Sequence, residues 1–160
     1  APGRAGAVRI GMRVAELRAR FGLTLREVTL MRGGEQYPAF AIGSVGSSRL
    51  PALLLEPLCE DGEDDAAGAP TDRCRIWRIT IRDPSYRTAS GLGVGSRYGE
   101  VRRAAPVTFV GPNPMGTAAT VESWQLNFLL DPEALTARKL PVHRETIHDS
   151  VRVVGVQLYR

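Results

Sequence analysis

The chain has 160 residues and a mass of 17.4 kDa, which suits one domain or two very small ones. Hydrophobic residues make up 43% and charged residues 24%, a balance that is typical of a folded globular chain and excludes a disordered one. The formal net charge is +4, but the basic residues form no arm or block of the kind that marks a nucleic-acid-binding protein. No apolar run approaches the roughly 18 residues of a membrane-spanning helix, so no transmembrane segment is predicted.

Residues 10–22 are predicted to form a short strand, a turn and a helix. The helix is expected because apolar side chains recur at helical spacing, at Val14, Leu17 and Phe21. Gly22 can end the helix as a left-handed cap. The residues that follow alternate in the manner of half-buried strands, so a run of antiparallel strands is expected after the helix.

Two cysteines, Cys59 and Cys74, bracket a strongly acidic segment at residues 60–65. Both flank apolar runs that indicate strands, and adjacent antiparallel strands would bring them within the Cα separation of about 4.4 to 6.8 Å that a disulfide needs. The sequence thus favours a disulfide, and with it an oxidising compartment, over two unrelated buried thiols. A calcium site in the acidic segment is not expected, because the alternating oxygen ligands and closing glutamate of an EF-hand are missing.

The most informative feature is an internal similarity between residues 10–18 and residues 94–102, at an offset of 84. The glycine, both arginines and the glutamate are identical in the two stretches, which indicates a repeat. A second helix is therefore predicted, on the apolar stripe of Tyr98, Val101 and Ala105.

The last strand of each half matches as well, at an offset of 77. Alternating apolar positions carry this match, namely Trp77, Ile79 and Ile81 in the first half and Val154, Val156 and Leu158 in the second. A further strand is expected where Trp124, Leu126, Phe128 and Leu130 alternate with polar residues. Turns at residues 43–48 and 131–133 are expected to join strands.

These patterns predict an α+β fold in which two tandem helix-plus-antiparallel-strand repeats form one helix-backed antiparallel sheet. The first repeat covers residues 1–83 and includes the acidic insertion between the cysteines, and the second covers residues 84–160. Together the repeats are expected to make one compact domain, with one sheet face in the core and the other open to water.

The stretch from Ile10 to Gly22, with its strand-Gly-Met opening, Glu-Leu in the helix and closing Phe-Gly, resembles the opening of the SmpA/OmlA outer-membrane assembly lipoproteins. The tandem arrangement resembles the fold that these share with the β-lactamase inhibitor protein, and residues 88–95 look like the joint in uncharacterised duplicated bacterial secreted proteins and lipoproteins. The chain departs from the assembly lipoproteins in its duplication, its acidic insertion and its lack of an N-terminal lipidatable cysteine. The resemblance implies a secreted or cell-envelope interaction protein and carries over no catalytic residue.

Few residues point to catalysis or metal binding. His143 and His148 are five positions apart, so neither a strand nor a helix makes them a good ligand pair, and a solvated loop is the better interpretation. No Gly-x-Ser-x-Gly elbow is present, and the glycines of residues 91–95 lack both the Walker lysine and the dinucleotide spacing. The sequence therefore predicts no catalytic residue, no metal site and no cofactor.

We expect a non-enzymatic extracytoplasmic protein whose open sheet face or edge binds another protein or a cell-envelope component, and no specific nucleic acid. The predicted binding residues lie opposite the core positions of the strands. They are Arg78, Arg82, Gln125, Asn127, Gln157 and Tyr159. Arginine and tyrosine are frequent at binding hot spots, although an ordinary solvated sheet face explains any single one of these positions equally well.

Two alternative functions remain. A hydrolase or small-ligand-binding protein would have a pocket between the repeats, and its support in the sequence is the group His143, Glu145, His148 and Asp149. Weak polyanion binding would follow from the net positive charge alone. Because the chain starts at Ala1 without a methionine or a hydrophobic signal segment, we expect a mature or trimmed form in the periplasm or outside the cell, with any lipid anchor outside the chain shown.

Overall fold

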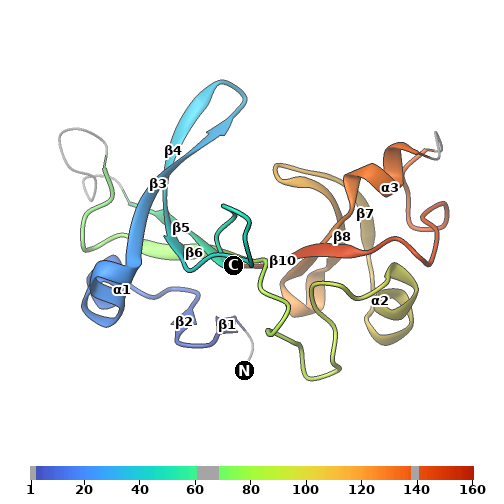
Figure 1. Ribbon diagram of the computed structural model, residues 1–160, viewed down its shortest axis with the longest axis horizontal. Coiled ribbons are helices and arrows are strands. Elements are labelled where there is room, and N and C mark those ends of the chain that lie inside the picture. The colour runs from blue at the N-terminus through green and yellow to red at the C-terminus, as the bar shows by residue number, and fades with distance from the viewer. Residues whose placement is uncertain (1–2, 61–68, 138–140) are drawn as a thin grey trace. The chain divides into compact units, whose positions relative to one another are not determined.

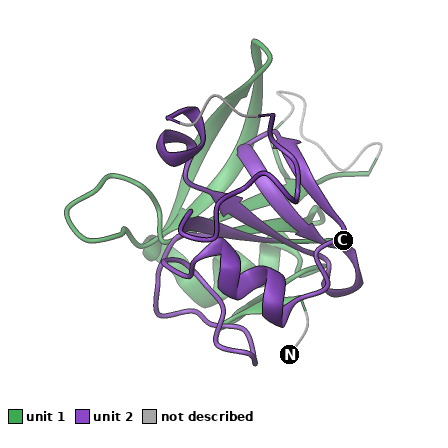
Figure 2. Cartoon of the chain, turned by 90° about the vertical axis from the view of Figure 1, so that its right-hand side faces the viewer, with its two compact units in different colours: residues 1–80, 158–160 green, residues 81–157 purple. Residues whose placement is uncertain are grey.

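The computed structural model describes residues 3–60, 69–137 and 141–160. The chain divides into two compact units, residues 1–80 with 158–160 and residues 81–157 (Figure 2). Most of the predicted acidic insertion, residues 61–68, lies outside the described residues. Each unit is described by itself below.

Unit 1 contains two very short paired strands, one helix and four longer strands (Figure 1). In chain order these are β1 (Arg4–Ala5), β2 (Val8–Arg9), α1 (Val14–Phe21), the 3₁₀ turn η1 (Gly22–Thr24), β3 (Leu25–Arg32), β4 (Glu35–Ile42), β5 (Leu53–Leu58) and β6 (Arg75–Ile81). The β3–β4 hairpin is tight, because Gly33 and Gly34 adopt φ angles of 58° and 85°. Such positive φ values at both central positions are the geometry of a two-residue hairpin turn.

Among its described residues, unit 2 has two short helices, three whole strands and most of a fourth. Its elements are α2 (Tyr98–Ala104), β7 (Phe109–Asn113), β8 (Gly116–Val121), the 3₁₀ turn η2 (Glu122–Trp124), β9 (Leu126–Leu130), α3 (Pro132–Thr136) and β10 (Val153–Tyr159). The strands β7, β8 and β9 form an antiparallel meander. The apolar side chains of α2 that the sequence predicts to face the core, Tyr98 and Val101, are both 0% exposed.

The predicted fold, one helix-backed sheet made by two helix-plus-strand repeats, is wrong. Eight strands form an antiparallel sheet in the order β3-β4-β5-β6-β10-β9-β8-β7, and β1 and β2 form a separate two-stranded sheet. The three α-helices have only eight, seven and five residues. A helix of eight residues is about 12 Å long, the width of about two to three strands, so strands dominate the described chain and the helices are too short to back the whole sheet.

The expectation of one open sheet face is also wrong for the middle of unit 1. Along β5, Leu53 and Leu55 point to one face and are 4% and 0% exposed, while Leu54 and Glu56 point to the other face and are 3% and 4% exposed. A strand that is covered on both faces carries a continuous apolar run instead of an alternating one. The run of three leucines is this signal.

Two predicted local elements of unit 2 also differ from the structure. The strand expected from Trp124 begins only at Leu126, because η2 precedes it and Gln125 has a left-handed φ of 51°. The turn expected at residues 131–133 is instead the start of α3. Asp131 caps this helix by accepting a hydrogen bond from the backbone N–H of Glu133, and Pro132 occupies its first turn, where proline is well tolerated.

Backbone hydrogen bonds attach the start of α1 to the chain that leads into β6. We call these four bonds the docking bonds of unit 1. They run from the N–H of Gly11 to the carbonyl of Ile76 (2.7 Å), from Ile76 to Met12 (2.9 Å), from Val14 to Cys74 (2.9 Å) and from Ala15 to Asp72 (3.1 Å). The last two of these bonds satisfy N–H groups of Val14 and Ala15, at the beginning of the helix, that have no partner within it.

Four bonds of the same kind attach α2 to the chain that leads into β10, and these are the docking bonds of unit 2. They run from Gly95 to Val153 (2.8 Å), from Val153 to Ser96 (2.8 Å), from Tyr98 to Val151 (2.7 Å) and from Gly99 to Asp149 (3.0 Å). In each bond, the residue on the helix side is 84 positions after its counterpart in unit 1, and the residue on the strand side is 77 positions after its counterpart. These are the two offsets found in the sequence.

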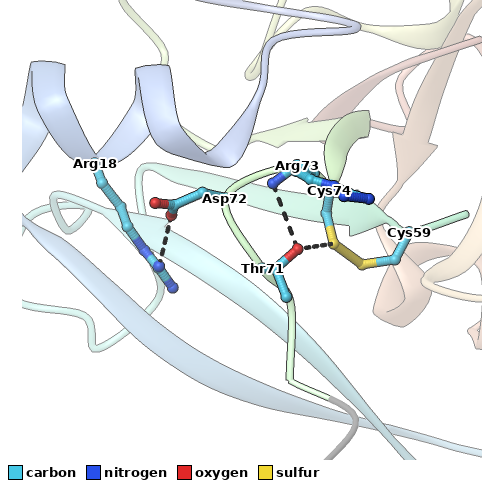
Figure 3. Close-up of a disulfide and its surroundings, with 6 residues drawn as sticks. All are labelled: Arg18, Cys59, Thr71, Asp72, Arg73 and Cys74. Carbon is cyan, nitrogen blue, oxygen red and sulfur yellow. Dashed lines mark hydrogen bonds and ion pairs between the residues drawn. A yellow bond between two sulfur atoms is a disulfide. The ribbon is translucent and has the colours of Figure 1, made fainter. Parts of the chain in front are cut away.

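Cys59 and Cys74 form a disulfide, as the sequence predicts, with a Cα–Cα separation of 4.4 Å. Cys59 directly follows β5 and Cys74 directly precedes β6, so the bridge joins the ends of these two strands. Figure 3 shows that the same short segment holds α1, because Asp72 accepts a hydrogen bond of 2.8 Å from Arg18 of the helix. The disulfide therefore lies in the segment that positions α1.

Candidate binding surface

A cluster of three ionised side chains lies within unit 1, on strands β3, β5 and β6. We call Arg32, Glu56 and Arg78 the arginine–glutamate cluster. Nη1 of Arg32 lies 2.6 Å from Oε1 of Glu56, and Nη1 of Arg78 lies 3.7 Å from the same oxygen. The side chains are 19%, 5% and 13% exposed in the order Arg32, Glu56 and Arg78. Charged side chains are seldom this buried unless they are paired.

The strand pairing explains which face carries the cluster. In the strand register, Phe40 lies opposite Leu55 on one side and Glu27 on the other, so these three residues share a face. Helix α1 covers this face, because its Arg18 forms an ion pair with Glu27 and lies over the ring of Phe40. Side chains alternate between the faces of a strand, so Glu56 lies on the opposite face. The cluster is therefore on the face of the sheet opposite to α1.

Arg78 has the least complete set of partners in the cluster. Its guanidinium lies 4.0 Å from the ring centre of Trp77, a cation–π contact. Its buried Nη1 has no hydrogen-bond partner, because 3.7 Å to Glu56 is beyond hydrogen-bonding distance. Burial lowers the pKa of Arg78, nearby Glu56 opposes this shift, and Arg32 adds to it.

Two exposed side chains share the face of the cluster. Tyr37 and Leu58 are 40% and 60% exposed, and strand alternation places Leu58 on the same face as Glu56. The guanidinium of Arg32 lies 6.0 Å from the ring centre of Tyr37. The hydroxyl of Tyr37 donates a hydrogen bond of 2.5 Å to Glu35, and this bond raises the pKa of Tyr37. The buried charges thus have an aromatic and an aliphatic side chain beside them.

Of the predicted binding residues, Arg78 alone belongs to this cluster. Arg82 follows β6 and is half-buried, its pKa is lowered by burial, and its guanidinium makes no hydrogen bond or ion pair within the described residues. Tyr159, at the end of β10, is also half-buried. Gln125 is exposed but lies between η2 and β9, outside any strand.

The prediction that Gln157 lies on an open face is wrong, because this residue is 0% exposed. Its Oε1 accepts hydrogen bonds from Nδ2 of Asn113 at 3.1 Å and from Nδ2 of Asn127 at 3.5 Å. Asn127 in turn accepts a bond of 2.9 Å from the hydroxyl of Thr120. The structure thus joins Gln157 and Asn127 in a neutral buried network of unit 2, as satisfied polar groups of the interior.

Sequence reasoning missed Arg32 and Glu56. A signal for Glu56 was present, since it is a charged residue that directly follows three buried leucines and would be expected to have a charged partner. The identity of that partner has no local signal, because Arg32 and Arg78 come from other strands.

The residues that support the hydrolase alternative have other contacts. Asp149 pairs with Arg102, at 2.8 Å from Nε of the arginine, and Nδ1 of His148 lies 2.7 Å from the hydroxyl of Ser150. His143 and Glu145 are exposed. A small pocket in unit 2 is lined by His148 together with Ala134, Leu135, Pro141, Val142, Thr146, Ile147 and Val151. Among the described residues, no three metal-ligating side chains gather in one place.

A solved structure with a similar fold is that of the uncharacterised protein YfeY from Escherichia coli. The two chains superpose with a TM-score of 0.61 at 14% sequence identity, over 97% of this chain and 94% of the other. No protein-family model and no curated protein sequence matches the chain. In the described part of the chain, every helix is too short or too polar to span a bilayer. The comparison therefore defines the fold class and leaves the function to the chemistry of the site.

Proposed function

We propose that this chain is a non-enzymatic extracytoplasmic protein-binding module whose binding surface is the face of unit 1 around Arg78. The observation that carries the proposal is the state of the Arg78 guanidinium, which is largely buried and donates no hydrogen bond within the described part of the chain. A guanidinium has five N–H donors, so one that makes no hydrogen bond can still gain acceptors from a partner molecule. Partly buried arginines beside aromatic rings are frequent at binding hot spots.

The exposed neighbours of the cluster support the same surface. Tyr37 and Leu58 offer apolar area that a partner would cover, and aromatic side chains bind at little cost in conformational entropy. The partner is another protein or a component of the cell envelope.

The proposed location is the periplasm or the outside of the cell. The Cys59–Cys74 disulfide supports it, because disulfides form and persist in oxidising compartments. To test this location, native cells would be quenched with acid so that thiols and disulfides stop exchanging. The fraction of oxidised cysteine in this protein is then measured. Fully reduced cysteines in the trapped protein would contradict it.

We further propose that the two units contain copies of one internal repeat. The support is that the docking bonds recur at constant offsets in the two units, and so do the aspartate–arginine pairs Asp72–Arg18 and Asp149–Arg102. A variant in which residues 71–74 take the sequence of residues 148–151, with Cys59→Ala, should keep its docking bonds. Loss of amide protection throughout α1 in that variant would contradict equivalence of the two segments.

Site-specific crosslinking tests the binding surface. We would place p-benzoylphenylalanine at Tyr37 and, as a matched control, at Leu23, which is 104% exposed on η1. After irradiation in an extract of the native cell envelope, the proposal expects a discrete protein adduct at Tyr37 and none at Leu23. Equal adducts at both positions, or none at Tyr37, would contradict it.

A further inference from the structure

The positive charge of Arg78 indicates what its partner carries. Resting on the proposed function, we infer that the partner inserts a carboxylate, from an aspartate or glutamate of an acidic peptide segment, against the guanidinium of Arg78. Glu56 is the nearest carboxylate to Arg78 among the described residues, and it makes its close contact with Arg32 instead. An added carboxylate would give Arg78 a counter-charge at hydrogen-bonding distance.

The distances show which arginine is available. Oε1 of Glu56 lies 2.6 Å from Nη1 of Arg32, which is a short charge-assisted contact. The same oxygen lies 3.7 Å from Arg78, where no hydrogen bond forms. A guanidinium has five N–H donors and no acceptor, so Arg78 needs acceptor atoms from elsewhere.

The environment favours a carboxylate over other acceptors. Because Arg78 is largely buried, its positive charge is poorly solvated, and this lowers its pKa. A neutral carbonyl would add no counter-charge. A carboxylate supplies one negative charge and the two parallel acceptors that fit a guanidinium fork. A carboxylate thus matches the single charge of Arg78, whereas a phosphate group carries nearly two negative charges.

The arginines of the cluster keep some exposed surface, and the exposed side chains of Tyr37 and Leu58 lie on the same face. Nη1 of Arg78 is covered, but the side chain as a whole keeps 13% of its surface exposed and Arg32 keeps 19%. A carboxylate would therefore meet the outer part of the Arg78 guanidinium while the apolar part of the segment covers Tyr37 and Leu58. Exclusion of water by such a rim strengthens the buried ion pair.

The test uses a displayed library of random linear peptides that is panned against the whole chain. The enriched peptides are then synthesised, and their dissociation constants are measured for the wild type and for three variants. Arg78→Gln removes the positive charge, and Glu56→Gln removes the competing carboxylate. Arg49→Gln is the control, because Arg49 is an exposed arginine in the loop between β4 and β5. Near-ultraviolet circular dichroism and a denaturant curve establish that each variant is folded at the temperature of measurement.

We expect the enriched peptides to share an aspartate or glutamate. Their affinity should fall about tenfold or more in Arg78→Gln, rise in Glu56→Gln and stay unchanged in Arg49→Gln. Peptides that are enriched and lose affinity in Arg78→Gln but share no acidic residue would overturn this inference and leave the proposed binding surface intact. Unchanged affinity in Arg78→Gln, together with no crosslink at Tyr37, would overturn both. If Glu56→Gln does not fold, Arg78→Lys replaces it, and a loss of affinity there supports the bidentate geometry.

Discussion

The two units hold their helices with the same backbone hydrogen bonds but with different side chains. Where unit 1 has Cys74 in a disulfide, unit 2 has Val151, which is 3% exposed. The position of Val14 in unit 1 corresponds to Tyr98 in unit 2, whose hydroxyl donates a bond of 2.8 Å to the carbonyl of Arg144. The difference shows that backbone geometry is the shared constraint, while covalent, apolar and polar side-chain contacts can each support it.

A second difference concerns polar groups in the interior. Unit 1 buries an ionised cluster around Glu56, whereas unit 2 buries a neutral network around Gln157. Buried charges cost more to desolvate than buried amides, and Nη1 of Arg78 lacks a hydrogen-bond partner, which is why the proposed binding surface is placed at the charged cluster. Asn113 and Asn127 of the same unit both donate hydrogen bonds to Oε1 of Gln157, and we assign this network a structural role.

The largest expected effect comes from substituting the buried polar residue at the centre of each unit's group. Glu56→Gln removes the carboxylate that contacts Arg32 and lies nearest to the largely buried Arg78, and should lower the free energy of unfolding by about 3 kcal/mol. Gln157→Met in unit 2 removes an acceptor from two asparagine side chains and should cost about 1 to 2 kcal/mol. Urea denaturation of both variants, with Arg49→Gln as a control, measures the two costs. A smaller loss of unfolding free energy in Glu56→Gln than in Gln157→Met would contradict the expectation that the charged cluster costs more to disrupt than the neutral network.

Removing the disulfide tests the docking of α1 against that of α2. The double variant Cys59→Ala with Cys74→Ala opens a bridge between residues 15 positions apart and should cost about 3 kcal/mol. Hydrogen exchange should show faster exchange at the amides of Val14 and Ala15, which make docking bonds to the cysteine segment. The corresponding amides Tyr98 and Gly99 are the internal control. Equal acceleration in α1 and α2 would contradict a local role for the bridge.

A glycine-to-alanine exchange compares the same docking position in the two helices. At Gly99 an added Cβ would lie 2.8 Å from both Cβ and Cγ of Asp149, so Gly99→Ala should cost about 1 to 3 kcal/mol through overpacking. Unit 1 has Ala15 at the corresponding place, and Ala15→Gly should cost only about 0.5 to 1 kcal/mol through helix propensity. Thermal or urea denaturation compares the two. A Gly99→Ala variant as stable as the wild type would show that Asp149 moves freely.

The smallest expected effect is a pH dependence confined to unit 2. Burial raises the pKa of Tyr98, so the folded state holds this proton more tightly than the unfolded state. The resulting stability is present below the unfolded pKa of about 10 and is lost as the pH rises through the higher folded value. Amides of α2 should therefore lose protection at alkaline pH before those of α1, where Val14 cannot titrate. Tyr98→Phe should remove the difference, and its persistence in that variant would contradict the assignment to Tyr98.

Much of the local structure could be predicted from the sequence. The predicted helix stripes at Val14 and Leu17 and at Tyr98 and Val101 are buried in α1 and α2, because helical spacing of apolar residues is a local signal. The disulfide was predicted because each cysteine adjoins a recognisable strand. The candidate site was predicted only at Arg78, since alternation places this residue opposite the core but says nothing about its neighbours across the sheet.

Sequence alone determined where α1 and α2 lie, that the two cysteines meet, and that two stretches of chain repeat a helix-starting pattern. These properties depend on side-chain spacing along a few residues, which is written directly in the chain. Only the tertiary structure decided that eight strands share one sheet, that both faces of β5 are covered, and that Gln157 is buried. It also brought Arg32 and Arg78 to Glu56, because strand order and register join residues that are distant in the sequence and whose pairing no local pattern specifies.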